Sequence, residues 1–211
     1  MKILAVSDQM DDRLYSPHIR DRFPDISLLV GCGDLPYEYL EFLVTALNVP
    51  LVYVPGNHDP RHDPANPESQ AEGGICIDQR CMRLKGLLLA GSGGSIRYLP
   101  ERVNQYTQSE MYTRLARLVL PLLWQRWFHR RPLDLLIAHS PPLGVHDDDD
   151  PAHTGFGAYR DFLRIFRPRY FLHGHTMYYK GNLEPPVTQI GATRVINVFP
   201  YRVIEVTPYA G

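Results

Sequence analysis

The sequence contains few cysteines and no long apolar run. Three of its 211 residues are cysteines, and they form neither a Cys-x-x-Cys pair nor an even-numbered framework. Reduced thiols in a cytoplasmic protein are the simplest interpretation. The first apolar run, residues 3–6, meets Asp8 before it is long enough for a signal peptide. No stretch approaches the roughly 20 apolar residues that span a bilayer, so we expect neither a disulfide scaffold nor a membrane partner.

An excess of charge of one sign is also lacking. Lys and Arg together number 22 and Asp and Glu 23, which gives a formal net charge of −1. This balance provides no broad attraction for nucleic acid, so nucleic acid is not the expected partner. Hydrophobic residues make up 44% and charged residues 21% of the chain, the profile of a globular protein. No internal repeat is evident, and residues 1–211 fit a single domain.

Short apolar runs bounded by Gly, Asp, Asn or His recur along the chain and predict strands buried on both faces. Helix-period patterns lie between some of them, and one begins at Thr107 with a capping box to Glu110. Pro121 should end or kink that helix, and we expect Trp124 and Trp127 to be packing residues. The expected strands are residues 3–6, 28–30, 51–54, 87–90, 135–138 and 170–172, with more in 189–206; two further helices are expected at 37–47 and 157–166. This alternation predicts an α/β fold.

Polar residues stand where these apolar runs end. The carboxyl ends of strands in an α/β sheet meet at one edge, where ligands bind. We therefore expect carboxylates, one carboxamide and several imidazoles to gather there. The residues concerned are Asp8, Asp34, the segment Asn57-His58-Asp59, His139, and the pair His173 and His175.

This mixture of side chains suits a metal-dependent hydrolase. Carboxylate oxygen and imidazole nitrogen bind divalent ions such as Mn, Zn, Fe and Ni. A carboxylate can bridge two such ions, which lower the pKa of bound water and hold a substrate for in-line attack on phosphorus. A histidine outside the ligand set can protonate the leaving group. The expected substrate is a small phosphate ester.

The same residues, taken in order, resemble the calcineurin-like metallophosphoesterases. The pattern of that family is D-x-H, G-D-x-x, G-N-H-D/E, a lone His, and then G-H-x-H or a close relative. The resemblance extends from Asp8 to His175, and its most specific element is Gly56-Asn57-His58-Asp59. It implies two packed mixed β-sheets flanked by helices, a four-layer αββα sandwich.

The resemblance also implies a role for each residue. Asp34 would bridge two divalent ions, with Mn favoured over Fe, Zn or Ni. Asp8 and His175 would complete the first metal site. The second site would be completed by Asn57, His139 and His173.

Catalysis in this scheme depends on two side chains beside the bridging Asp34. Asn57 would neutralise phosphoryl oxygens and contact the substrate. His58 would bind phosphate and act as the general acid, with Asp59 as its supporting partner. Both phosphomonoesters and phosphodiesters remain open as substrates.

One residue departs from the family pattern. Met10 stands where D-x-H has its histidine, and a thioether is a soft ligand that matches these ions poorly. Three outcomes are open: one metal only, two metals with water in place of the histidine, or replacement by Gln9, Asp11 or Asp12. We favour an asymmetric dinuclear site in which the first metal binds weakly.

Two other functions compete with this one. A phosphoesterase-like scaffold depleted of metal could serve as a protein- or ligand-binding module, and Met10 motivates that alternative. A two-metal hydrolase of carbon centres would usually begin with His-x-His, whereas here the histidine pair comes late. The loops at residues 60–74 and 140–154 would form the rim of the site, and the acidic run 147–150 is expected to be solvated. The sequence leaves the oligomeric state open.

Overall fold

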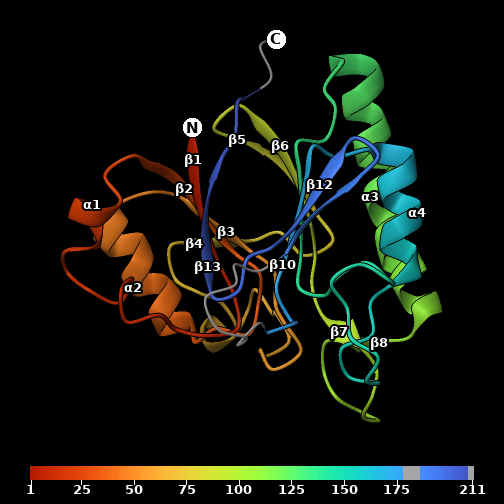
Figure 1. Ribbon diagram of the computed structural model, residues 1–211, viewed down its shortest axis with the longest axis horizontal. Coiled ribbons are helices and arrows are strands. Elements are labelled where there is room, and N and C mark those ends of the chain that lie inside the picture. The colour runs from red at the N-terminus through yellow and green to blue at the C-terminus, as the bar shows by residue number, and fades with distance from the viewer. Residues whose placement is uncertain (178–185, 209–211) are drawn as a thin grey trace.

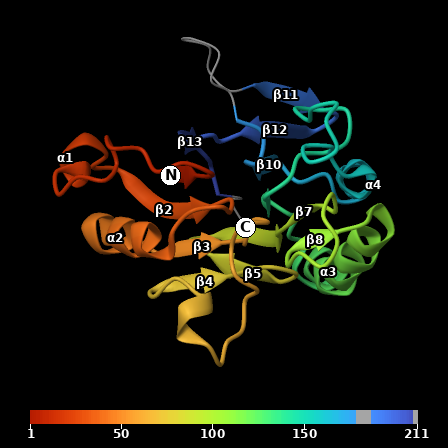
Figure 2. The same ribbon diagram turned by 90° about the horizontal axis from the view of Figure 1, so that it is seen from below.

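Two β-sheets packed face to face form the centre of the molecule. The computed structural model describes residues 1–177 and 186–208. One sheet has five strands in the order β13-β1-β2-β3-β4, and the other has six in the order β11-β12-β10-β9-β6-β5. Figures 1 and 2 show α1 and α2 outside the first sheet and α3 and α4 outside the second. The expected αββα sandwich is therefore confirmed.

The five-stranded sheet is parallel except for its edge strand β13. Its strands are β1 (Lys2–Val6), β2 (Ile26–Gly31), β3 (Leu51–Tyr53), β4 (Gly74–Cys76) and β13 (Tyr201–Glu205). Its helices are α1 (Ile19–Arg22) and α2 (Tyr37–Leu47), and a 3-10 turn (Pro67–Ser69) lies between β3 and β4.

The six-stranded sheet is parallel at its centre and antiparallel at both edges. Its strands are β5 (Cys81–Leu84), β6 (Leu87–Ser92), β9 (Leu135–Ala138), β10 (Tyr170–His173), β11 (Val187–Ile190) and β12 (Thr193–Asn197). Its helices are α3 (Gln108–His129) and α4 (Gly157–Phe166), and a small two-stranded sheet is formed by β7 (Ser95–Ile96) and β8 (Gln105–Tyr106). Across residues 1–177 and 186–208, none of the helices combines the length and the apolar character that a membrane span requires.

Three apolar layers hold these elements together. The central layer lies between the sheets and includes Ile3, Leu28 and Ile137, all fully buried. A second layer joins the six-stranded sheet to α3 and α4, and a third joins the five-stranded sheet to α1 and α2. Because the central strands are buried on both faces, their sequences are continuous apolar runs rather than alternating ones.

Helix α3 departs from expectation at two points. It begins with the predicted capping box at Thr107, but it continues through Pro121 to its end. Pro121 lies on the exposed side, where water can satisfy the carbonyl that loses its helical partner. Trp124 and Trp127, expected to be packing residues, are 55% and 69% exposed, and the Trp124 ring centroid lies 4.0 Å from that of Phe128 at the surface. The buried stripe lies on the opposite face of the helix.

A matched pair of leucines on α3 tests this orientation. Leu118 is 1% exposed and Leu120 is 77% exposed. We expect Leu118→Ala to lower the free energy of unfolding by about 2–5 kcal/mol, because a buried leucine is removed. Leu120→Ala should change it by no more than about 0.5 kcal/mol. Urea unfolding of both variants measures the difference, and equal losses would contradict the placement of this helix.

Candidate metal centre

The loops after β2 and β3 are tied together around Asp34. Asp34 has a left-handed backbone, with φ 56°, and its Oδ1 accepts a hydrogen bond of 2.8 Å from the backbone N–H of His58. Asp59 Oδ2 in turn accepts from the backbone N–H groups of Asp34 at 2.9 Å and Gly56 at 2.7 Å. A side chain at Gly56 would place its Cβ 2.0 Å from Asp34 Oδ1, so only glycine fits there.

His139, at the end of β9, presents one ring nitrogen to this pair of loops. Its Nδ1 lies 2.8 Å from the Cys32 carbonyl oxygen, which can only accept, so Nδ1 carries the proton. In the neutral ring this leaves a lone pair on Nε2. That nitrogen lies 3.0 Å from Asn57 Oδ1 and 3.3 Å from Asp34 Oδ2. Three electron-pair donors therefore meet at one point.

His175 joins the same cluster from the turn after β10. Its Nε2 lies 2.8 Å from the Ala152 carbonyl oxygen, which assigns the proton to Nε2 and leaves Nδ1 as the lone pair. Its ring centroid is 4.7 Å from that of His139. Ligand atoms of Asp34, His139 and His175 all lie within 4.8 Å of one another, a spacing that fits one metal ion.

The charges in the cluster favour a cation between these atoms. Burial raises the pKa of Asp34, but the charge of His139 and several hydrogen bonds outweigh it, so the pKa is lowered. Burial alone would lower the pKa of His139, but the negative charges of Asp34 and Asp8 outweigh burial and raise the pKa to about 9. Burial, with the His139 charge, lowers the pKa of His175 to about 3, so this ring is neutral and its lone pair is available.

Asp8 lies beside the cluster and supports its geometry. Its Oδ2 accepts a hydrogen bond of 2.9 Å from the backbone N–H of His175, and burial raises the pKa of the carboxyl. A Cβ on Gly174 would lie 2.3 Å from the same oxygen. Asp8 and Asp34 both line a pocket of about 380 Å³, and Met177 also lines it.

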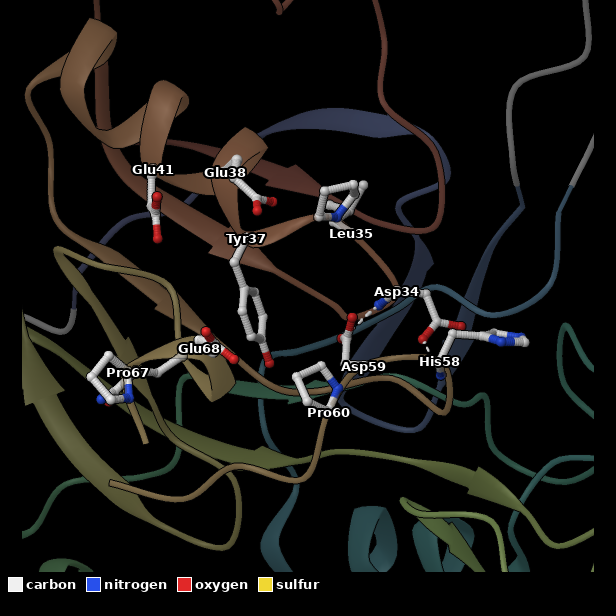
Figure 3. A pocket seen from close by; sticks show the side chains of 12 residues that line it. Asp34, Leu35, Tyr37, Glu38, Glu41, His58, Asp59, Pro60, Pro67 and Glu68 are labelled. Atoms are coloured by element: carbon white, nitrogen blue, oxygen red, sulfur yellow. Dashed lines mark hydrogen bonds between the residues drawn. The ribbon is translucent and has the colours of Figure 1, made fainter. Parts of the chain in front are cut away.

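His58 and Asp59 are adjacent in sequence but have different environments. Figure 3 shows the His58 ring directed away from Asp34 and Asp59. His58 is exposed and lines both the pocket beside Asp8 and a neighbouring pocket of about 680 Å³. Asp59 is 8% exposed, and burial followed by the charge of Asp34 raises the pKa of its carboxyl to about 6. The Asp59 carboxylate therefore holds the loop backbones. It had been expected to support the His58 ring instead.

The structure does not bring His173 to this cluster. Its Nδ1 donates to the Gly174 carbonyl oxygen at 2.9 Å, and its Nε2 lies 2.9 Å from Nδ1 of His146. His146 Nε2 accepts from the Thr188 hydroxyl at 2.8 Å. Burial lowers the pKa of His173 to about 3 and that of His146 to about 4, so the chain consists of neutral rings. The expected grouping of His173 with Asn57 and His139 is therefore corrected: His175 occupies that position.

A different alignment of the family pattern would have found this arrangement. Laid on Gly174-His175-Thr176-Met177, the G-H-x-H pattern assigns His175 to the cluster and puts Met177 at its last position. Sequence reasoning also missed Tyr98, whose hydroxyl lies 3.4 Å from Asn57 Nδ2. Tyr98 follows no strand end with a recognisable motif, so no sequence signal pointed to it.

The neutral histidine chain makes a prediction about acid stability. In the unfolded state His146 should titrate near its usual value of about 6.5, whereas its folded pKa is about 4. The unfolded chain then binds more protons over this interval, so stability falls as the pH drops below about 6.5. We expect His146→Ala to lower the free energy of unfolding at neutral pH by about 1–3 kcal/mol, because His173 loses its partner.

The variant should also lose less stability than the wild type between pH 6.5 and pH 4.5, because one titrating group is gone. Urea unfolding across this range measures both effects. Identical pH slopes for the two proteins would contradict the assignment of His146 as a buried neutral ring.

Comparisons with known proteins agree with this geometry. The family model for calcineurin-like phosphoesterases matches residues 12–179. An uncharacterized protein of Methanocaldococcus jannaschii is 26% identical over 214 residues, which cover 95% of this chain and 88% of that protein.

Solved structures share the fold. The crystal structure of TT1561 from Thermus thermophilus superposes with a TM-score of 0.60 at 20% identity, covering 93% of this chain and 88% of that one. Another solved structure gives a TM-score of 0.65 at 17% identity, with 96% of this chain and 94% of that one covered. Together with the match over residues 12–179, this places the chain in the calcineurin-like phosphoesterase family.

Proposed function

We propose that the protein is a metal-dependent phosphoester hydrolase whose primary metal site is formed by Asp34, Asn57, His139 and His175. The observation that carries this proposal is the convergence of potential ligand atoms: those of Asp34, His139 and His175 lie within 4.8 Å of one another, and Asn57 Oδ1 lies 3.0 Å from His139 Nε2. The Nδ1 proton of His139 and the Nε2 proton of His175 are both committed to backbone carbonyls. The other nitrogen of His139 lies 3.0 Å from Asn57 Oδ1 and 3.3 Å from Asp34 Oδ2, and a divalent cation that displaces the proton from this nitrogen would satisfy these atoms together.

The chemistry of the donors favours a particular class of ion. Two imidazole nitrogens, a carboxylate and an amide oxygen suit Mn, Fe, Zn or Ni, and we favour Mn. Such an ion, when bound, lowers the pKa of a water molecule and neutralises charge on the phosphoryl oxygens. The protein holds its ligands firmly, because each coordinating ring is oriented by a second hydrogen bond.

The site is proposed to bind two metal ions with unequal affinity. On the side of Asp8, the carboxylates of Asp8 and Asp34 remain as ligands, but Asp8 Oδ2 is already occupied by a backbone N–H. Met10 and Met177 stand at the two places where the family pattern has histidines, and they are 48% and 45% exposed. Since thioethers match these ions poorly, the first metal is expected to bind weakly.

Two side chains are proposed to act on the substrate. The His58 ring is exposed in the pocket, and its backbone N–H is fixed to Asp34, so the ring can reach a leaving-group oxygen and protonate it. Asn57 has its Oδ1 toward His139 and its Nδ2 toward Tyr98. The amide N–H groups can therefore contact a phosphoryl oxygen while Oδ1 binds the metal.

A metal-depleted binding module is the second candidate function. The two methionines favour it, because they remove imidazoles from the first site. The intact set of Asp34, Asn57, His139 and His175 speaks against it, since a scaffold needs no such set of oriented donors. The metal content of the purified protein separates the two: a stoichiometry near zero that stays there when Mn is added would support the scaffold.

The histidines after β10 provide a matched test of the ligand set. We expect His175→Ala to weaken Mn binding at least 100-fold, because a metal ligand is lost, whereas His173→Ala should change it by only a few-fold. Isothermal titration calorimetry on the folded variants measures both. If His173→Ala loses the metal and His175→Ala retains it, the proposed ligand set is wrong.

The catalytic role of His58 gives a second test. With added Mn, the wild type should hydrolyse an aryl phosphate monoester or diester. His58→Ala should lower kcat by about 10²–10⁴-fold, the usual contribution of a general acid, while it retains Mn. The exposed His18 is the matched control, and His18→Ala should leave the rate unchanged. A wild type that binds Mn but is inert on both kinds of ester would contradict the proposed function.

A further inference from the structure

A third pocket, of about 750 Å³, has a basic lining. We refer to it as the basic pocket. Its acidic residues number three: Asp78, Glu101 and Glu110. Its arginines number six: Arg61, Arg80, Arg97, Arg102, Arg114 and Arg117. The chain as a whole is nearly neutral, so this concentration of arginine is a local feature.

The acidic residues orient part of this lining but do not neutralise it. Asp78 holds Arg114, with both carboxylate oxygens 2.7 Å from one guanidinium nitrogen, and the guanidinium lies over the Tyr106 ring at 3.9 Å. Glu110 pairs with Arg97 at 2.8 Å. Arg114 is thus fixed in place with its planar group at the pocket wall, as in sites that bind phosphate through arginine.

The other arginines carry charge that the described residues leave uncompensated. Within residues 1–177 and 186–208, Arg61, Arg80 and Arg102 form no ion pair. Two buried nitrogens of the lining, Arg114 Nε and His62 Nδ1, also lack a hydrogen-bond partner in the described part of the chain. Buried polar atoms are nearly always paired, so these two leave hydrogen-bonding capacity at the pocket wall for water or a polar ligand.

Hydrogen bonds connect the lining of the basic pocket to the segments that form the metal centre. Asn104, in the basic pocket, has φ 55° and donates its Nδ2 to the carbonyl oxygens of Asp59 at 3.0 Å and Pro60 at 3.3 Å. Gln105 Oε1 accepts from the backbone N–H of Tyr98, whose hydroxyl contacts Asn57. The chain that follows His58 therefore leads directly from one pocket to the other.

We propose that the basic pocket binds phosphate groups of a phosphorylated ligand. Two sources supply this chemistry: the distal phosphates of a substrate whose scissile phosphate lies at the metal centre, or a separate phosphorylated effector. The substrate reading rests on the proposed function, whereas the binding itself does not. If the ligand is the substrate, the enzyme prefers phosphoesters that carry further phosphate groups over simple monoesters.

Binding is tested first, with inorganic tripolyphosphate and the metal-free full chain in isothermal titration calorimetry. Arg80 and Arg102 are the residues to change, because in the described part of the chain they form no ion pair whose loss would disturb folding. We expect the double variant Arg80→Gln/Arg102→Gln to bind tripolyphosphate at least tenfold more weakly than the wild type. Arg20→Gln/Arg22→Gln removes the same charge from exposed positions on α1 and should bind within twofold of the wild type. Equal binding by all three proteins, or equal weakening in both variants, would overturn the proposal.

Kinetics with Mn then separate the two sources. The substrates are p-nitrophenyl phosphate and the p-nitrophenyl ester of a nucleoside triphosphate at its terminal phosphate. If the ligand is the substrate, Arg80→Gln/Arg102→Gln lowers kcat/KM at least tenfold for the triphosphate ester and less than twofold for the simple ester. If the double variant binds tripolyphosphate more weakly but has unchanged kcat/KM for both esters, the ligand is an effector. The proposal that it is the substrate is then overturned.

The outcome also separates this proposal from the proposed function. A wild type inert on both esters would refute the hydrolase, yet a tripolyphosphate affinity that depends on Arg80 and Arg102 would still support the basic pocket. An active wild type whose tripolyphosphate affinity is insensitive to both arginines would refute the basic pocket and leave the hydrolase standing.

Discussion

The hydrogen bond between His139 and the Cys32 carbonyl joins the two sheets at the point where the site forms. Cys32 follows β2 in one sheet, and His139 follows β9 in the other. This contact fixes the tautomer of the ring and directs Nε2 toward Asp34 and Asn57, both from the first sheet. The metal centre is thus a product of the packing between sheets, because neither sheet supplies a complete ligand set alone.

The site also requires a backbone that most residues avoid. Asp8, Asp34 and His175 all have positive φ, at 63°, 56° and 66°. Such conformations cost roughly 1 kcal/mol or more each and persist where surrounding contacts enforce them. Here the enforcing contacts are hydrogen bonds from backbone N–H groups to carboxylates, including those made by Asp59. The buried carboxylates therefore serve the geometry of the loops as well as the chemistry.

Much of this architecture could be predicted from the sequence. Helices at residues 37–47 and 157–166 and six buried strands were expected, because apolar period and turn residues agree there. Placing Asp34, Asn57 and His139 at one edge followed from the positions of the strand ends. The basic pocket was not predicted, because its residues come from four separate segments that only the fold brings together.

The sequence positions of His173 and His175 do not show which of the two rings joins the metal cluster. His173 is the last residue of β10, and its ring contacts His146 from a loop whose path the sequence does not define. His175 reaches the cluster because its backbone turns into the left-handed region. The exposure of the two tryptophans of α3 was not predicted for a related reason. Local propensity does not reveal which face of a helix is covered.

The central claim is that a metal ion is held by Asp34, Asn57, His139 and His175. Anomalous diffraction from crystals grown with Mn tests it most directly. The strongest anomalous peak should lie between Asn57 Oδ1, His139 Nε2 and His175 Nδ1, in contact with the Asp34 carboxylate. A weaker peak is expected beside Asp8. A strongest peak at His146 and His173, or no peak near Asp34 at saturating Mn, would contradict the account.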